Sequence, residues 1–318
     1  MPSEQSWFKP LQQITGAAHA TCSREERLCY SYDATGRSYI PDAVVFPGSE
    51  EEVSRILQLS DQHDLIVVPR GAGSGMTGGA VPVKGGIAMV FTRMNQILEL
   101  DENNFWVKVQ PGVVVADIHA AVEKKGLFYP PDPASASVCT IGGNIGECAG
   151  GPRAVKYGVT RDYVLGLRVV LASGNIIETG VKTAKGVAGY DLTRLIVGSE
   201  GTLGIVTEIT LKLLPKPETI KTLAVFFDNT VTAAGAVSKI MKTAVVPRCV
   251  EYLDKASLEL VKNSLAFSLP QGFEAMLIIE VDGSDQSVED DSLKIETLCK
   301  KLGSLEVRIA KDDQETVQ

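Results

Sequence analysis

Short apolar runs alternate with amphipathic stretches near the start of the chain. Apolar positions at helical spacing within 7–16 predict a helix. The apolar run 43–46 predicts a strand, and Ser49 followed by Glu52 has the spacing of a capping box that begins the next helix. A second apolar run, 65–68, predicts a buried strand parallel to the first. The pattern therefore predicts a β-α-β unit.

Farther along, the pattern becomes one of short strands interrupted by a single helix. A hairpin is expected to turn at 173–175, and 203–213 alternates between apolar and polar residues as a long half-buried strand does. Gly126 is a plausible residue to end the helix. The expected strands are 87–92, 97–100, 105–110, 165–172, 176–179 and 203–213, and the expected helix is 114–125.

Pro215-Lys216-Pro217 predicts a domain boundary, because prolines interrupt both helices and sheets. Beyond it the elements follow the order β-α-β-β-α-β, which is typical of a ferredoxin-like arrangement, and a polar tail follows at 311–318. The expected strands are 223–227, 249–253, 275–281 and 305–309, with helices at 231–243 and 288–301 and a short helix near 257. The expected regions are a lead-in at 1–40 and domains at 41–217 and 218–318.

Two segments rich in glycine interrupt these elements. Residues 69–79 hold five glycines in eleven residues, and 142–151 hold five more in ten. Glycine permits positive φ angles and brings main-chain N–H groups close to a ligand, and successive N–H groups form a site for anions. Either segment alone is an ordinary tight turn, but two such loops about seventy residues apart favour a dinucleotide-like cofactor with a diphosphate.

The first segment contains a GxGxxG pattern at 73–78, directly after a strand. In the dinucleotide-binding fold the third glycine of this pattern lies inside a helix. Here Pro82, Gly85 and Gly86 prevent a helix of useful length. We therefore interpret the match as incidental and do not expect an NAD(P) site.

Composition narrows the classes of function. The net charge of −8 argues against a nucleic-acid binder. No apolar run has the length of a membrane span or a signal peptide, so we expect a cytoplasmic protein. The six cysteines contain no CxxC pair, which indicates reduced thiols rather than a zinc or iron–sulfur site. His19, His63 and His119 are isolated, so we expect structural or surface roles for them and no metal site.

Five motifs in one order carry a resemblance to a known family. They are Pro-Arg-Gly-Ala-Gly-Ser-Gly at 69–75, Pro-Asp-Pro-Ala-Ser at 131–135, Thr-Ile-Gly-Gly-Asn at 140–144, Gly-Pro-Arg and Lys-Tyr-Gly within 151–158, and Gly-Ser-Glu-Gly-Thr-Leu-Gly-Ile-Val at 198–206. Together they resemble the FAD-binding domain of the p-cresol methylhydroxylase (PCMH) and vanillyl-alcohol oxidase superfamily. The most similar branch holds the glycolate oxidase FAD subunits and the D-lactate dehydrogenases.

The resemblance implies an α+β fold, in which a PCMH-type FAD-binding domain of two subdomains precedes a partial ferredoxin-like cap domain. FAD would extend between the subdomains, with its diphosphate on loop 70–79. Relatives that attach FAD covalently carry a histidine at or beside position 74, where this chain has Ser74, so non-covalent FAD is implied. The implied cofactor-binding residues are Arg70, Gly71, Ala72, Gly73, Ser74, Gly75, Met76, Thr77, Gly78, Gly79, Pro131, Asp132, Ser135, Thr140, Gly142, Gly143, Asn144, Gly146, Glu147, Gly150, Gly151, Gly158, Glu200, Gly204, Ile205 and Val206.

The same resemblance implies a reaction: oxidation of a small 2-hydroxy acid, of the lactate or glycolate type, to the 2-oxo acid by hydride transfer to flavin N5. Electrons would pass to an iron–sulfur protein or an electron-transferring flavoprotein. Family members place the catalytic base and a histidine metal cluster in later regions, so no catalytic residue is assigned and we expect the chain to be part of a longer one. Two alternatives remain open: another hydroxyl-bearing substrate, or a non-catalytic FAD-binding subunit or module of an electron-transfer complex.

Overall fold

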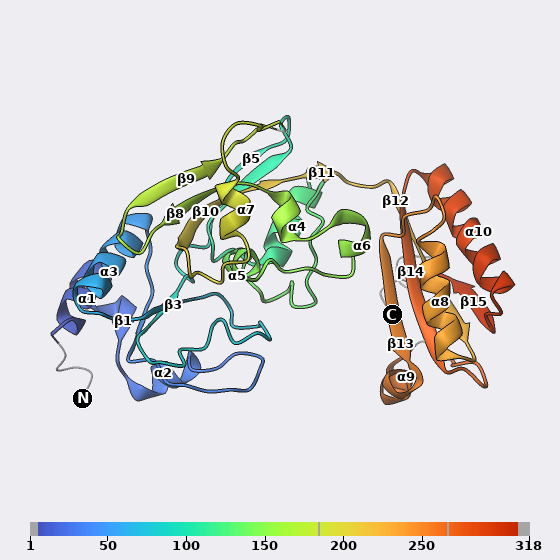
Figure 1. Ribbon diagram of the computed structural model, residues 1–318, viewed down its shortest axis with the longest axis horizontal. Coiled ribbons are helices and arrows are strands. Elements are labelled where there is room, and N and C mark those ends of the chain that lie inside the picture. Colours follow the sequence, from blue (N-terminus) through green and yellow to red (C-terminus); the bar gives the residue numbers. More distant parts are fainter. Residues whose placement is uncertain (1–5, 184, 266, 311–318) are drawn as a thin grey trace. The chain divides into compact units, whose positions relative to one another are not determined.

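The computed structural model describes residues 6–183, 185–265 and 267–310 (Figure 1). The expected tail at 311–318 and the first five residues of the lead-in lie outside this range. The chain forms two compact units: Met1–Ala149 with Val159–Pro215, and Gly150–Gly158 with Lys216–Gln318.

The first unit begins with a four-stranded sheet in the order β1-β2-β4-β3. Both β2 and β3 run parallel to β4, which lies between them, and β1 pairs antiparallel with β2. The expected β-α-β unit is therefore wrong in one respect, because its two strands are not neighbours. All four residues of β4 are buried whereas most of β3 is half-buried, so β4 has the better apolar surface for the central position. The strands are β1 (Ala20–Thr21), β2 (Ala43–Val45), β3 (Val67–Arg70) and β4 (Ile87–Val90).

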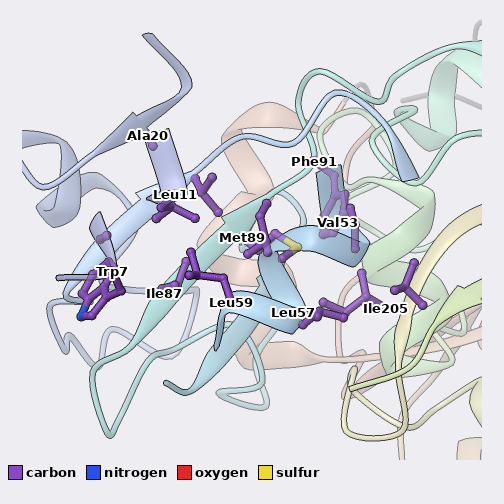
Figure 2. Close-up of a cluster of buried hydrophobic side chains, with 14 of the residues drawn as sticks. Trp7, Leu11, Ala20, Val53, Leu57, Leu59, Ile87, Met89, Phe91 and Ile205 are labelled. Atoms are coloured by element: carbon purple, nitrogen blue, oxygen red, sulfur yellow. The ribbon is translucent and has the colours of Figure 1, made fainter. Parts of the chain in front are cut away.

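Helices α1 (Phe8–Thr15) and α3 (Glu50–Gln62) cover this sheet, and α2 (Arg24–Cys29) precedes β2. The Ser49 side chain accepts a hydrogen bond from Glu52 N at 3.2 Å, as expected of an N-cap. The Glu52 carboxylate instead accepts from Gly48 N at 2.7 Å, so the capping box is shifted by one residue. Figure 2 shows the apolar core between α1, α3 and the strands.

The second sheet of the first unit has five antiparallel strands in the order β5-β6-β10-β8-β9. The expected hairpin and the long alternating strand form β8, β9 and β10, which confirms both predictions. Around this sheet lie α4, α7, the 3-10 helix η3 and the small pair β7 with β11. The bounds are β5 (Ile97–Asp101), β6 (Trp106–Val109), β8 (Val164–Val170), β9 (Ile176–Gly180), β10 (Ile205–Lys212), α4 (Val115–Glu123), α7 (Leu192–Ile196), η3 (Thr160–Tyr163), β7 (Leu127–Phe128) and β11 (Leu214–Pro215).

The second glycine-rich segment does not form the loop that was expected. Its residues Ile141–Glu147 form a short helix, α5, which ends at Cys148 in the left-handed conformation. Glycine is unfavourable in helices, but here its lack of a side chain permits close packing. A Cβ on Gly142 would lie 2.7 Å from Pro111 Cβ, so tertiary contacts override the local preference. Residues 71–86 contain no helix, as expected from Pro82, Gly85 and Gly86.

The second unit contains a four-stranded antiparallel sheet in the order β13-β14-β12-β15, which is the ferredoxin-like order that the sequence predicted. Alternate residues of β12 point to opposite faces: Val225 belongs to the core beneath α8 and α10, and Phe226 to the cluster near α9. Its elements are β12 (Thr219–Phe227), α8 (Thr230–Ile240), β13 (Cys249–Asp254), α9 (Lys255–Val261), η4 (Lys262–Ser264), β14 (Ala275–Gly283), α10 (Asp285–Lys301), β15 (Glu306–Ile309) and, from the earlier segment, α6 (Ala154–Tyr157). Within the described residues we find no helix with the length and apolarity of a membrane span.

Candidate functional site

Loop 70–79 and the part of the second glycine-rich segment that lies in the first unit, 142–149, are side by side, as a shared cofactor would require. The Thr77 hydroxyl lies 2.9 Å from both carboxylate oxygens of Glu147. A Cβ placed on Gly71 would lie 2.3 Å from Thr140 Oγ1, so only glycine allows this approach. Loop 70–79 and helix α5 therefore form one continuous surface, although about seventy residues separate them in sequence.

A third segment, 198–204, packs against α5. Gly198 N donates to Ile145 O at 2.9 Å, and Glu200 N donates to Gly146 O at 3.0 Å. Glu200 and Gly201 both have positive φ angles, and a Cβ on Gly201 would lie 2.3 Å from Pro69 Cγ. The turn before β10 thus touches both α5 and the residue that leads into loop 70–79.

Two carboxylates converge where the three segments meet. A Cβ on Gly79 would lie 2.6 Å from Glu200 Oε2 and 2.8 Å from Glu147 Oε1. Burial raises the pKa of Glu147, and the nearby charges of Glu200 and Asp33 raise it further, against the opposing hydrogen bond from Thr77. The proton of Glu147 is therefore held more tightly than that of an ordinary glutamic acid.

Arg70 lies beneath the glycine loop rather than at its rim. Its side chain is buried, it donates to Ala80 O at 3.2 Å, and its guanidinium is 5.8 Å from the centre of the Tyr30 ring. A Cβ on Gly73 would lie 2.1 Å from Arg70 Nη2, so the loop rests directly on the guanidinium. The burial lowers the pKa of Arg70, while the charge of Asp33 opposes this effect. Arg70 supports the loop from within.

Helix α5 carries polar groups that fit a bound cofactor. Thr140 Oγ1 and Asn144 Nδ2 are buried, and within the described part of the chain neither has a hydrogen-bond partner. Buried polar atoms are costly when unpaired, so they are expected to meet polar groups of a ligand. Gly143 on the same helix has only Thr140 Oγ1 near the position of a Cβ, at 3.6 Å. An extended polar molecule with a diphosphate therefore suits this surface.

The segment 131–135 is tied to α4. His119 Nε2 lies 2.9 Å from Pro131 O, which is the structural role expected for this histidine. Cys139 N donates to Ser135 O at 2.8 Å, and this turn leads directly to Thr140 and α5. Asp132 and Ser135 are half-buried.

The residues at the start of β10 differ in what they face. A Cβ on Gly204 would lie 2.6 Å from Val169 Cγ1, so this glycine permits close packing within the sheet. Ile205 points into the apolar core near Leu57 (Figure 2), and Val206 is half-buried. The Ile205 side chain therefore serves the core, and only its main chain is left for a ligand.

Three predicted residues, Gly150, Gly151 and Gly158, belong to the second unit, in the segment that holds α6.

Two further groups of residues near the predicted positions were not identified from the sequence. Asp33 is buried beside the glycine loop, near Arg70 and Glu147, without any motif to mark it. Lys156 and Tyr157 were part of a motif but received no role.

A separate cavity of about 650 Å³ lies elsewhere in the first unit. It is lined by parts of η3, β8, α7 and the segment after β9, including Lys182, Tyr190 and Arg194, and by none of the sequence-predicted site residues. Within the described residues, no group of three or more histidine, cysteine, aspartate or glutamate side chains could hold a metal ion.

The sequence of the chain matches two protein families and several known proteins. The family described as "FAD binding domain" matches residues 41–180, and the family described as "FAD linked oxidases, C-terminal domain" matches residues 216–318. Glycolate oxidase subunit GlcD of Bacillus subtilis is 51% identical over 306 residues, which is 96% of this chain and 65% of that protein. A D-lactate dehydrogenase of Anaerostipes hadrus is 38% identical and covers 85% of this chain and 58% of its own length.

Among solved structures, an alkyldihydroxyacetonephosphate synthase aligns with a TM-score of 0.82 over 96% of this chain and 61% of its own, at 23% identity. That identity supports the α+β fold alone. The chain spans 56–65% of the length of the first curated relatives that it matches.

Proposed function

The chain belongs to the FAD-linked oxidases, and from this premise we propose that it is the FAD-binding part of a dehydrogenase that oxidises a small 2-hydroxy acid to the 2-oxo acid. FAD is the cofactor that the matched domain binds. A substrate of the lactate or glycolate type is supported by the names of the two relatives compared above.

One observation carries the proposal: loop 70–79, helix α5 and the turn at 198–204 meet through glycines whose Cβ atoms would collide with neighbouring segments. Such a surface exposes main-chain amides without side chains in front of them, and it suits a diphosphate. We assign the diphosphate to loop 70–79, the central part of the cofactor to Pro131, Asp132, Ser135 and α5, and the remaining contacts to Gly150, Gly151, Gly158, Glu200 and the main chain of 204–206.

Bound FAD would supply the hydride acceptor that oxidation of a hydroxyl-bearing carbon requires. The chain's own residues bind and orient. The amides of loop 70–79 would fix the anionic part of the cofactor, Thr140 and Asn144 would offer their buried polar atoms to it, and Arg70 would keep the loop in shape from below. We assign no residue of this chain as the catalytic base.

We propose that the FAD is bound non-covalently, because loop 70–79 contains no histidine to which it could be attached. We further propose an iron–sulfur protein or an electron-transferring flavoprotein as electron acceptor, since one relative is named as a subunit and this chain contains no CxxC pair for a cluster of its own. A cytoplasmic location would keep its six cysteines reduced, and all six are free thiols here.

Anaerobic reduction tests the activity. The FAD-loaded chain is mixed with D-lactate, L-lactate or glycolate, and the absorbance of oxidised flavin is followed. Bleaching of the band by one of these acids is the result that supports the activity. Tight FAD binding without bleaching by any of them would contradict the activity of this chain and favour the alternative, a non-catalytic FAD-binding subunit or module.

A further inference from the structure

A buried carboxylate in the second unit collects three hydrogen-bond donors. Asp282 lies on β14, and its side chain has no exposed surface. Lys156 Nζ pairs with its Oδ1, Tyr157 OH donates to Oδ2 at 2.8 Å, and Arg248 Nη1 donates to Oδ2 at 2.9 Å. Lys156 Nζ also donates to the main-chain oxygen of Asp282 at 2.9 Å.

The charges of this cluster balance. Arg248, also buried, pairs with Glu280 at 3.2 Å as well as with Asp282, so two cations face two carboxylates. Burial alone would raise the pKa of Asp282, but the hydrogen bonds from Lys156, Tyr157 and Arg248 outweigh it and lower the pKa. Asp282 is therefore ionised at neutral pH and holds its donors as a charge-assisted group.

Two of the three donors come from one short segment, which we call the 150–158 loop. Thr160 donates to Ala149 O from both N, at 3.1 Å, and Oγ1, at 2.7 Å, so the two ends of the loop are joined at their base. Lys156 and Tyr157 fasten the far part of the loop to β14. Within the second unit, Asp282 thus holds the α6 part of the loop through two side-chain donors.

We propose that Asp282 is a positioning residue for FAD: it fixes the 150–158 loop so that Gly150, Gly151 and Gly158 are held ready for the cofactor. The inference rests on the proposed function, since these glycines are proposed FAD contacts. The inference adds Asp282 to the residues that determine FAD affinity. Asp282 lies more than 120 positions from the loop in sequence and belongs to no recognisable motif.

The test compares variants that act on the loop side of the cluster. Lys156→Met and Tyr157→Phe remove donors from the loop and leave the Asp282–Arg248 pair in place, so the second unit is expected to fold. We expect the FAD dissociation constant to rise about tenfold in Lys156→Met and about threefold in Tyr157→Phe, because Lys156 supplies an ion pair and two hydrogen bonds whereas Tyr157 supplies a single hydrogen bond. Glu280→Gln, which weakens the ion pair with Arg248 and leaves the Lys156 and Tyr157 donors in place, is the control and should change the dissociation constant less than about twofold.

Two further readouts separate positioning from general stability. Trypsin should cut after Arg153 faster in Tyr157→Phe than in the control, because the loop is released. At saturating FAD, the visible circular dichroism of the flavin should change in the loop variants and not in Glu280→Gln. Unchanged affinity and dichroism in both loop variants would overturn the inference while leaving the proposed function intact. Failure of the unmodified chain to bind FAD would overturn both.

Discussion

Glu147 is the residue at which the electrostatics of the site are most readily tested. Burial is the main cause of its raised pKa, and Glu200 and Asp33 add to it. The folded chain therefore binds a proton at Glu147 at pH values where the unfolded chain, with an ordinary pKa of 4.5, has lost it. Glu147 therefore adds to the free energy of unfolding below pH 4.5, and this contribution is lost as the pH rises through the raised pKa of the folded chain.

Glu147→Gln should consequently stabilise the FAD-free chain at neutral pH. The amide oxygen still accepts the Thr77 hydrogen bond, but the like charges beside Glu200 are gone. We expect a gain of a few tenths to about 1 kcal/mol in urea unfolding at pH 7, shrinking toward zero below about pH 4.5. Thr77→Val, which removes the donor and leaves the charges, is the control and should not stabilise. A variant less stable than the unmodified chain at pH 7 would show that Glu147 is a favourable ion in the folded state.

At the scale of elements, the regular patterns were predictable from the sequence and the glycine-rich helix was not. The alternation in β10 identifies that strand because one of its faces is buried, and the apolar run 223–227 identifies β12, whose later residues are buried on both faces. Helix α5 has three glycines in seven residues, which local preference assigns to a loop. Its close packing against Pro111, about thirty positions earlier, is invisible in the local pattern. The insertion of β4 between β2 and β3 is equally a result of tertiary packing.

Two alanine substitutions in α5 test this explanation. Gly142→Ala improves helix preference, but its Cβ would lie 2.7 Å from Pro111 Cβ and 2.9 Å from Pro111 O. The collision should dominate, so we expect a loss of about 1–3 kcal/mol in urea unfolding. Gly143→Ala is the matched control, because its Cβ meets only Thr140 Oγ1 at 3.6 Å. It should be neutral or stabilising by up to about 1 kcal/mol. Equal effects of the two substitutions would refute the role assigned to the close contact.

At the scale of the whole molecule, the motifs predicted the family and the meeting of the two glycine-rich segments. They did so because glycine at 71 and 79 is required by contacts with residues about seventy positions away or more. The ionic cluster at Asp282 was not predictable, because a single acidic residue at the end of a strand has no distinctive pattern. The packing of Gly150–Gly158 with the second unit was not predicted either, because the local pattern does not show which sheet a short segment contacts.

Binding of FAD by the glycine-rich segments is the central prediction for this molecule. Equilibrium titration of the unmodified chain, Gly143→Arg and Gly235→Arg with FAD and with NAD tests it directly. An arginine at 143 would occupy the cofactor's surface, whereas Gly235 lies on the exposed side of α8 with no atom within 4 Å of a Cβ.

We expect the unmodified chain and Gly235→Arg to bind one FAD, released intact on denaturation, and not NAD. Gly143→Arg should remain folded and bind FAD at least about a hundredfold more weakly, since the arginine fills space that the cofactor needs. Equal FAD binding by Gly143→Arg, or uptake of NAD instead of FAD by the unmodified chain, would contradict the account.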